Sequence, residues 1–243
     1  MSENVFEKIV HVRRGGVTTR CWVVRVAECP LSVTLCRIVE DLAESLPDGS
    51  ITWCHAVSAD EVAAALGGEP SSAARRSLWE GSGEAGHHVQ RSGHGKTLII
   101  GELGSWFVVV EPDDWNGSEA LPRLSAGGEA LSLWLGDTMR HYDVHYARDG
   151  QELCRFRWGA EPDGDSSPLA GLLSGLSLTS GLPSWEALES GLPSFDEWKV
   201  HALILVERIT GVRLTRQWLS SEHTRFVQGP HSRDARPDGD LWL

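Results

Sequence analysis

The sequence predicts an α+β fold in which an antiparallel meander sheet carries helices packed mainly on one face. One observation is a block of strand-like runs between residues 96 and 157, separated by short turn signals. The other is a pair of helical apolar patterns at 31–46 and 195–210, on either side of that block. Because the strands follow one another in one long antiparallel block, the order argues against a doubly wound dinucleotide fold.

The N-terminal part divides into two segments. Residues 1–30 predict an extension or a hairpin, since two short extended runs flank Gly15-Gly16. Residues 31–46 predict an amphipathic helix, because apolar side chains recur there at helical spacing: Leu31, Leu35, Ile38, Val39, Leu42 and Leu46.

A strand is expected at 51–57, followed directly by a helix-start signal. Ser58 and Glu61 have the spacing of a capping box, in which the hydroxyl accepts from the amide three residues on. The short helix should end at Gly67-Gly68. Residues 68–95, rich in Gly, Ser and Glu, predict a loop or a partly ordered insertion.

The central block contains the strands of the meander, expected at 97–100, 106–110, 130–135, 141–147 and 151–158. The dipeptide Asp149-Gly150 is a strong two-residue hairpin turn between the last two. Ser118 is expected to cap a short helical turn between the second and third strands.

The C-terminal third begins with a Gly/Ser/Pro-rich stretch at 160–195, and a well-buried helix is expected from 195 to about 210. Thr215 is expected to cap a last short helix. Residues 222–243 are polar and predict a tail, so that a single α+β domain would span 31–221.

The chain carries a net charge of −12, which argues against nucleic-acid binding, because an acidic surface repels phosphate. It favours a basic protein partner instead. No apolar run reaches membrane-span length, so we expect no membrane insertion, and Arg20 and Arg25 interrupt any export signal. We therefore expect a cytoplasmic protein.

The five cysteines show no Cys-x-x-Cys spacing, which argues against a cysteine-based zinc site. No metal and no cofactor is predicted. The 11 tryptophans stand out against two tyrosines and five phenylalanines. Since Trp is favoured at binding hot spots, we select Trp106, Trp115 and Trp134 as candidate binding residues.

Three groups of residues carry a resemblance. They are Trp53-Cys54 with Ser58-x-x-Glu61-Val62 and Leu66-Gly67; Trp106-x-x-Val-Val-Glu111-Pro112-x-x-Trp115-x-Gly117-Ser118; and Leu124-Ser125-x-Gly127 with Trp134, Tyr146-Ala-x-Asp-Gly150 and Phe156. Together they resemble an uncharacterised family of actinobacterial proteins with a domain of unknown function, over roughly residues 50–215. The resemblance implies an intracellular bacterial setting and a shared α+β fold, but no activity.

Two groups of polar residues are candidates for catalysis. His141, Asp143 and His145 share one face of a strand, where two imidazoles and a carboxylate could serve as base and orienter or bind a divalent metal. Glu111, Asp113 and Asp114 stand in or beside a turn and could supply an acid–base pair.

Two functions fit these observations. The first is an accessory or immunity-like module that binds a partner and has no defined catalytic set, based on the acidity and the many Trp residues. The alternative is an enzyme of bacterial specialised metabolism that uses a His/Asp/Glu pocket, either with or without a bound metal ion. It requires the two candidate groups to converge.

Overall fold

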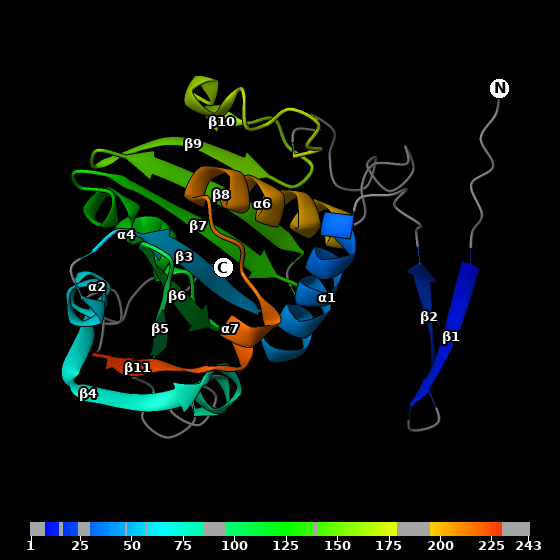
Figure 1. The fold of residues 1–243 in the computed structure, drawn as a ribbon, viewed down its shortest axis with the longest axis horizontal. Helices are drawn as coiled ribbons and strands as arrows, with labels where there is room; N and C mark the ends of the chain where they lie inside the picture. The colour runs from blue at the N-terminus through cyan, green and yellow to red at the C-terminus, as the bar shows by residue number, and fades with distance from the viewer. Residues whose placement is uncertain are drawn as a thin grey trace, which may run out of the picture.

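The computed structural model describes residues 8–14, 17–23, 30–46, 48–56, 58–84, 96–138, 140–178 and 195–229. Nine antiparallel strands form one open sheet in the order β10-β9-β8-β7-β3-β6-β5-β11-β4 (Figure 1). Their bounds are β3 Asp48–Cys54, β4 Gly68–Ser77, β5 Thr97–Leu103, β6 Trp106–Pro112, β7 Glu129–Gly136, β8 His141–Arg148, β9 Gln151–Arg157, β10 Asp163–Gly164 and β11 Glu222–Gln228. The predicted antiparallel α+β fold is confirmed.

The meander is interrupted at its centre by β3. This strand lies between β6 and β7, with Ile51 opposite both Val110 and Leu133. Six of its seven residues are buried, because both faces of the central sheet are covered. The sequence neighbours β7, β8, β9 and β10 then continue the sheet on one side of it.

The two longest helices pack together on one face of the sheet. They are α1 (Pro30–Ser45) and α6 (Phe195–Thr210), and Figure 1 shows both in front of the strands. Ile38 on α1 and Leu205 on α6 are completely buried in the larger core. Each such side chain contributes about 1.5–3 kcal/mol through burial, so the helices are held by this apolar face.

The opposite face carries two short helices, α2 (Ala59–Ala65) and α4 (Asn116–Leu124). Leu66 and Leu121 join Phe226 of β11 in a second, smaller core. The predicted cap of α2 is present, since Ser58 Oγ accepts from the amide of Glu61 at 3.2 Å. The cap of α4 differs from expectation: Trp115 is its N-cap residue, and Ser118 donates its hydroxyl to the Trp115 carbonyl oxygen.

Two segments contain more regular structure than the sequence pattern predicted. Within 68–95, where a loop was expected, Gly68–Ser77 forms β4 and residues 78–84 form a helix. The segment from Glu222 to Gln228, assigned to the tail, forms β11 between β4 and β5. The folded domain therefore extends through β11, because Phe226 supplies a fully buried side chain to the smaller core.

The remaining elements are short. The strands β1 (Lys8–Arg14) and β2 (Val17–Val23) form an antiparallel hairpin. The 3-10 turn η1 spans Ser167–Leu169, and α7 spans Arg216–Ser220 with Thr215 as its cap. Residues 230–243 of the expected tail lie outside the described residues. Among the described helices, none is both long and apolar enough to cross a membrane.

Candidate functional site

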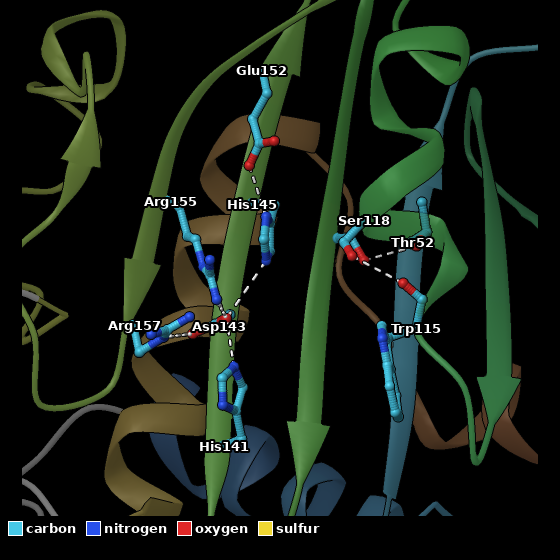
Figure 2. Close-up of polar contacts among 10 residues, drawn as sticks. Thr52, Trp115, Ser118, His141, Asp143, His145, Glu152, Arg155 and Arg157 are labelled. Atoms are coloured by element: carbon cyan, nitrogen blue, oxygen red, sulfur yellow. Dashed lines mark hydrogen bonds and ion pairs between the residues drawn. The ribbon is translucent and has the colours of Figure 1, made fainter. Parts of the chain in front are cut away.

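Strand pairing places two rows of polar and aromatic residues on the face of the sheet that carries α4. In one row, Asp143 of β8 lies opposite Trp134 of β7 and Arg157 of β9. In the next row, His145 lies opposite Arg155. Figure 2 shows Asp143 and His145 on β8 with Arg155 and Arg157 of β9 beside them. The predicted alternation along β8 is present, since Tyr142, Val144 and Tyr146 face the larger core.

Asp143 is the centre of this cluster and is fully buried. Its carboxylate accepts from Arg155 Nε at 2.9 Å and Arg157 Nε at 3.1 Å, and lies 2.7 Å from His141 Nε2. Burial by itself raises the pKa of Asp143. The contacts with His145 and His141 and the charge of Arg157 outweigh burial, so the pKa is lowered and the carboxyl is ionised.

His145 is held between two carboxylates. Its Nδ1 lies 2.7 Å from Glu152 Oε1, and its Nε2 lies 3.6 Å from Asp143 Oδ2. Burial by itself lowers the pKa of His145. The contacts with Asp143 and Glu152 and their negative charges have the larger effect and raise the pKa to about 9. The imidazole is therefore a cation at neutral pH, which leaves it no lone pair with which to accept a proton as a general base.

Three rings continue from the cluster across the sheet, and we call Trp115, Trp134 and His141 the aromatic ladder. Trp115 stacks on Trp134 with ring centroids 4.7 Å apart and an interplanar angle of 18°. The rings of Trp134 and His141 are also in contact, with centroids 4.1 Å apart. Trp115 keeps 38% of its surface exposed, and the other large exposed hydrophobic side chain in the described ranges is Trp79.

Glu111 does not join the Asp143 cluster. Its Oε1 accepts from Ser50 Oγ at 3.0 Å and from the amide of Gly117 at 2.7 Å, which ties the first turn of α4 to β3 and β6. The carboxyl is fully buried, and its Oε2 has no hydrogen-bond partner. Burial, and next the negative charge of Asp114, raise the pKa of Glu111 to about 8, so it is protonated at neutral pH.

Asp113 and Asp114 also have local partners. Asp114 is buried and accepts from Lys96 Nζ at 2.7 Å and from Asn116. Asp113 adopts a left-handed backbone conformation (φ 56°), and its amide donates to the Asp48 carbonyl oxygen. These contacts build the turn between β6 and α4 and leave the two groups of catalytic candidates in separate networks.

Trp106 occupies a different environment from the other two selected tryptophans. It is only 4% exposed and belongs to the larger core. Its indole N–H donates to the Thr210 carbonyl oxygen at the end of α6. Trp106 therefore fixes α6 on the sheet and takes no part in the aromatic ladder.

The charges around Asp143 do not suit a metal ion. Two guanidinium groups already contact its oxygens, and a cation placed there would be repelled by both. Within the described ranges, no group of three or more His, Cys, Asp or Glu side chains is placed to hold a metal. The metal-dependent form of the enzyme hypothesis is not supported by this donor set.

Sequence reasoning missed Arg155, Arg157 and Glu152. One signal was available: on β9 the two arginines alternate with the apolar Cys154 and Phe156, which places them together on the face away from the core. Their partner Asp143 could not be named from that pattern, because the alternation leaves the register between β8 and β9 open.

The structure thus defines an α+β protein with an open nine-stranded antiparallel sheet, bearing a charged cluster and stacked tryptophans on one face. A family model described as a family of unknown function, DUF6461, matches residues 43–231, and the chain belongs to this family. Neither the curated proteins nor the solved structures contain a match to the chain.

Proposed function

We propose that the chain is a binding module that docks a protein partner through the aromatic ladder of Trp115, Trp134 and His141. The observation that carries this proposal is exposed Trp115, which stacks on half-buried Trp134. A Trp pair held by stacking offers a large contact area and loses little side-chain entropy on binding, and Trp is enriched at interface hot spots.

The ionisation states within the Asp143 cluster support binding over acid–base catalysis. Asp143 is ionised against two guanidinium groups, and His145 is a cation between two carboxylates. A general base needs a free lone pair near the working pH. Glu111, whose carboxyl is protonated at neutral pH, is fully buried and separate from the cluster.

The net charge of −12 favours a basic partner. Complementary charge of this kind accelerates encounter and is screened by salt, while the aromatic contact supplies affinity once the complex has formed. The affinity for the partner should therefore decrease gradually as the salt concentration increases.

The proposal is tested by affinity capture from the native host with three tagged baits: the wild type, Trp115→Ala and the control Trp79→Ala. Trp79, at 69% exposure, is a matched exposed tryptophan outside the ladder. We expect one basic protein at near-equal stoichiometry with the wild type and the control, and its loss with Trp115→Ala. Equal capture by all three baits, or no stoichiometric partner, would overturn the proposal.

A further inference from the structure

The turn that carries Trp115 adds negative charge to one end of the aromatic ladder. We propose that this end of the ladder binds an arginine side chain of the partner, with the guanidinium packed on the exposed part of Trp115 and its charge paired with Asp113 and Asp48. The inference rests on the proposed docking function and names the chemical group that the surface recognises.

Strand register places Asp48 beside the ladder. Ser50 of β3 lies opposite Trp134 of β7, and residues opposite each other in an antiparallel pair share a face of the sheet. Asp48 stands two residues before Ser50, so it lies on the same face, opposite Gly136. A Cβ atom placed on Gly136 would be 3.5 Å from Trp134 Nε1, so the indole reaches toward the row that contains Asp48.

Asp113 lies at the same end of the ladder, because the turn after β6 is bonded to the start of β3. Its amide donates to the Asp48 carbonyl oxygen at 3.0 Å. Asp113 precedes Trp115 by two residues, so their Cα atoms are at most about 7.6 Å apart. Both residues are exposed. The long side chain of an arginine can therefore contact the ring and a carboxylate together.

The negative charge of Asp113 lacks a cation within the described part of the chain. Its neighbour Asp114 forms an ion pair with Lys96 at 2.7 Å, whereas Asp113 forms none among the described residues. Burial, and next the negative charge of Asp48, raise the pKa of Asp113. Asp48 accepts from the amide and the hydroxyl of Thr138, which carry no charge. A cation placed between the two carboxylates would relieve their repulsion.

Trp115 supplies the apolar part of this surface. Trp134 covers one face of its ring, so the exposed part of the ring is the other face and the edges. An exposed tryptophan beside carboxylates favours arginine over lysine, since the planar guanidinium packs on an aromatic ring and is less strongly hydrated than an ammonium group. The net charge of −12 attracts such a cation from a distance.

NMR of the indole N–H signals tests the proposal on the purified chain, with N-acetyl-arginine amide as the probe at constant ionic strength. We expect the Trp115 signal, assigned by its loss in Trp115→Phe, to shift until the site is saturated. The dissociation constant should be on the order of tens of millimolar, as one exposed aromatic and ionic contact gives. N-acetyl-citrulline amide has nearly the same shape without the charge and should bind at least about fivefold more weakly.

Asp113→Asn removes the charge and keeps the turn, because asparagine tolerates the left-handed backbone conformation of this residue (φ 56°). It should weaken binding of the arginine probe about threefold to fivefold. The control is Asp196→Asn, at a side chain 78% exposed on α6, which packs on the opposite face of the sheet. It removes the same charge and should leave the dissociation constant unchanged.

A second readout separates recognition from a structural role of Asp113. Because the charge of Asp48 opposes that of Asp113, the Tm of Asp113→Asn at neutral pH should equal or exceed that of the wild type. A carboxylate that stabilises the fold through a partner would instead give a lower Tm in the variant.

The proposal is overturned if the Trp115 signal does not respond to the arginine probe or if the citrulline probe binds equally well. Equal binding of the arginine probe by Asp113→Asn and the wild type, or a clearly lower Tm of this variant, would also overturn it. Because the titration needs no protein partner, its failure is distinguishable from a failure of the affinity capture that tests the docking function.

Discussion

Replacing Glu111 by Gln should stabilise the protein, and the gain should depend on pH. Glu111 is a fully buried carboxyl that accepts hydrogen bonds from Ser50 and Gly117 through Oε1. Glutamine keeps that acceptor and has nearly the same shape. It differs from the glutamate in having no proton to lose as the pH rises.

The size of the effect follows from the pKa of Glu111, which folding raises from 4.5 to about 8. Between these values the folded chain retains a proton that the unfolded chain releases. The free energy of unfolding of the wild type therefore falls by about 1.4 kcal/mol per pH unit in this window. The stability difference between Glu111→Gln and the wild type should grow by about 3 kcal/mol from pH 5 to pH 7.

Urea unfolding at pH 5, 6 and 7 measures this difference. Glu102→Gln, at an exposed glutamate on the neighbouring strand β5, serves as the surface control. A pH-independent difference for Glu111→Gln would refute the reasoning, because it would mean that Glu111 is already ionised in the folded chain.

Three further outcomes are expected. Cationic His145 stabilises the fold fully below pH 6.5, and this contribution disappears as the pH rises through about 9. The stability difference between wild type and His145→Gln, measured by urea unfolding, should shrink over that window, and a constant difference would contradict the raised pKa. Asp143→Asn should cost about 3–5 kcal/mol, because it removes the fully buried carboxylate that pairs with Arg155 and Arg157 and faces buried His145. Glu152→Gln changes a carboxylate that is 41% exposed and should cost less than about 1 kcal/mol. If the two variants lose the same free energy of unfolding in chemical denaturation, the buried position of Asp143 does not have the predicted effect. Ser58→Ala should cost about 1 kcal/mol through loss of the α2 cap, detected as a lower Tm; an unchanged Tm would mean that the cap contributes nothing.

The sequence predicts the helix starts well because the interactions that form them are local. Ser58 and Thr215 each accept from a backbone amide three residues further on, at 3.2 and 3.1 Å. The face shared by His141, Asp143 and His145 follows in the same way from the two-residue period of a strand. These features need no knowledge of distant parts of the chain.

The arginine partners of Asp143 depend on an irregularity that the sequence does not reveal. A regular ladder from the Asp149-Gly150 turn would place Arg155 opposite Val144, on the core face. Instead the register shifts at Leu153, which has no opposite residue on β8, and Arg155 lies opposite His145. A one-residue shift moves every following side chain to the other face. The bulge thus brings both arginines to Asp143.

The late strand β11 was missed for a different reason. Its apolar content is small, with Phe226 and Val227 among polar residues, so no pattern within Glu222–Gln228 identifies a buried strand. The segment is a strand because β4 and β5 lie on either side of it and satisfy its backbone groups.

The position of β11 has a consequence for how the chain reaches its native state. Gln228 donates its side-chain amide to the Leu66 carbonyl oxygen, 162 residues earlier, and β3 bonds to segments 61 and 80 residues away. Contacts so distant in sequence slow folding, because long loops must close before they form. During synthesis β4 emerges early but lacks β11, its neighbour in the described sheet, until residue 228 has left the ribosome. An exposed strand edge persists until then, so truncation before β11 should favour aggregation.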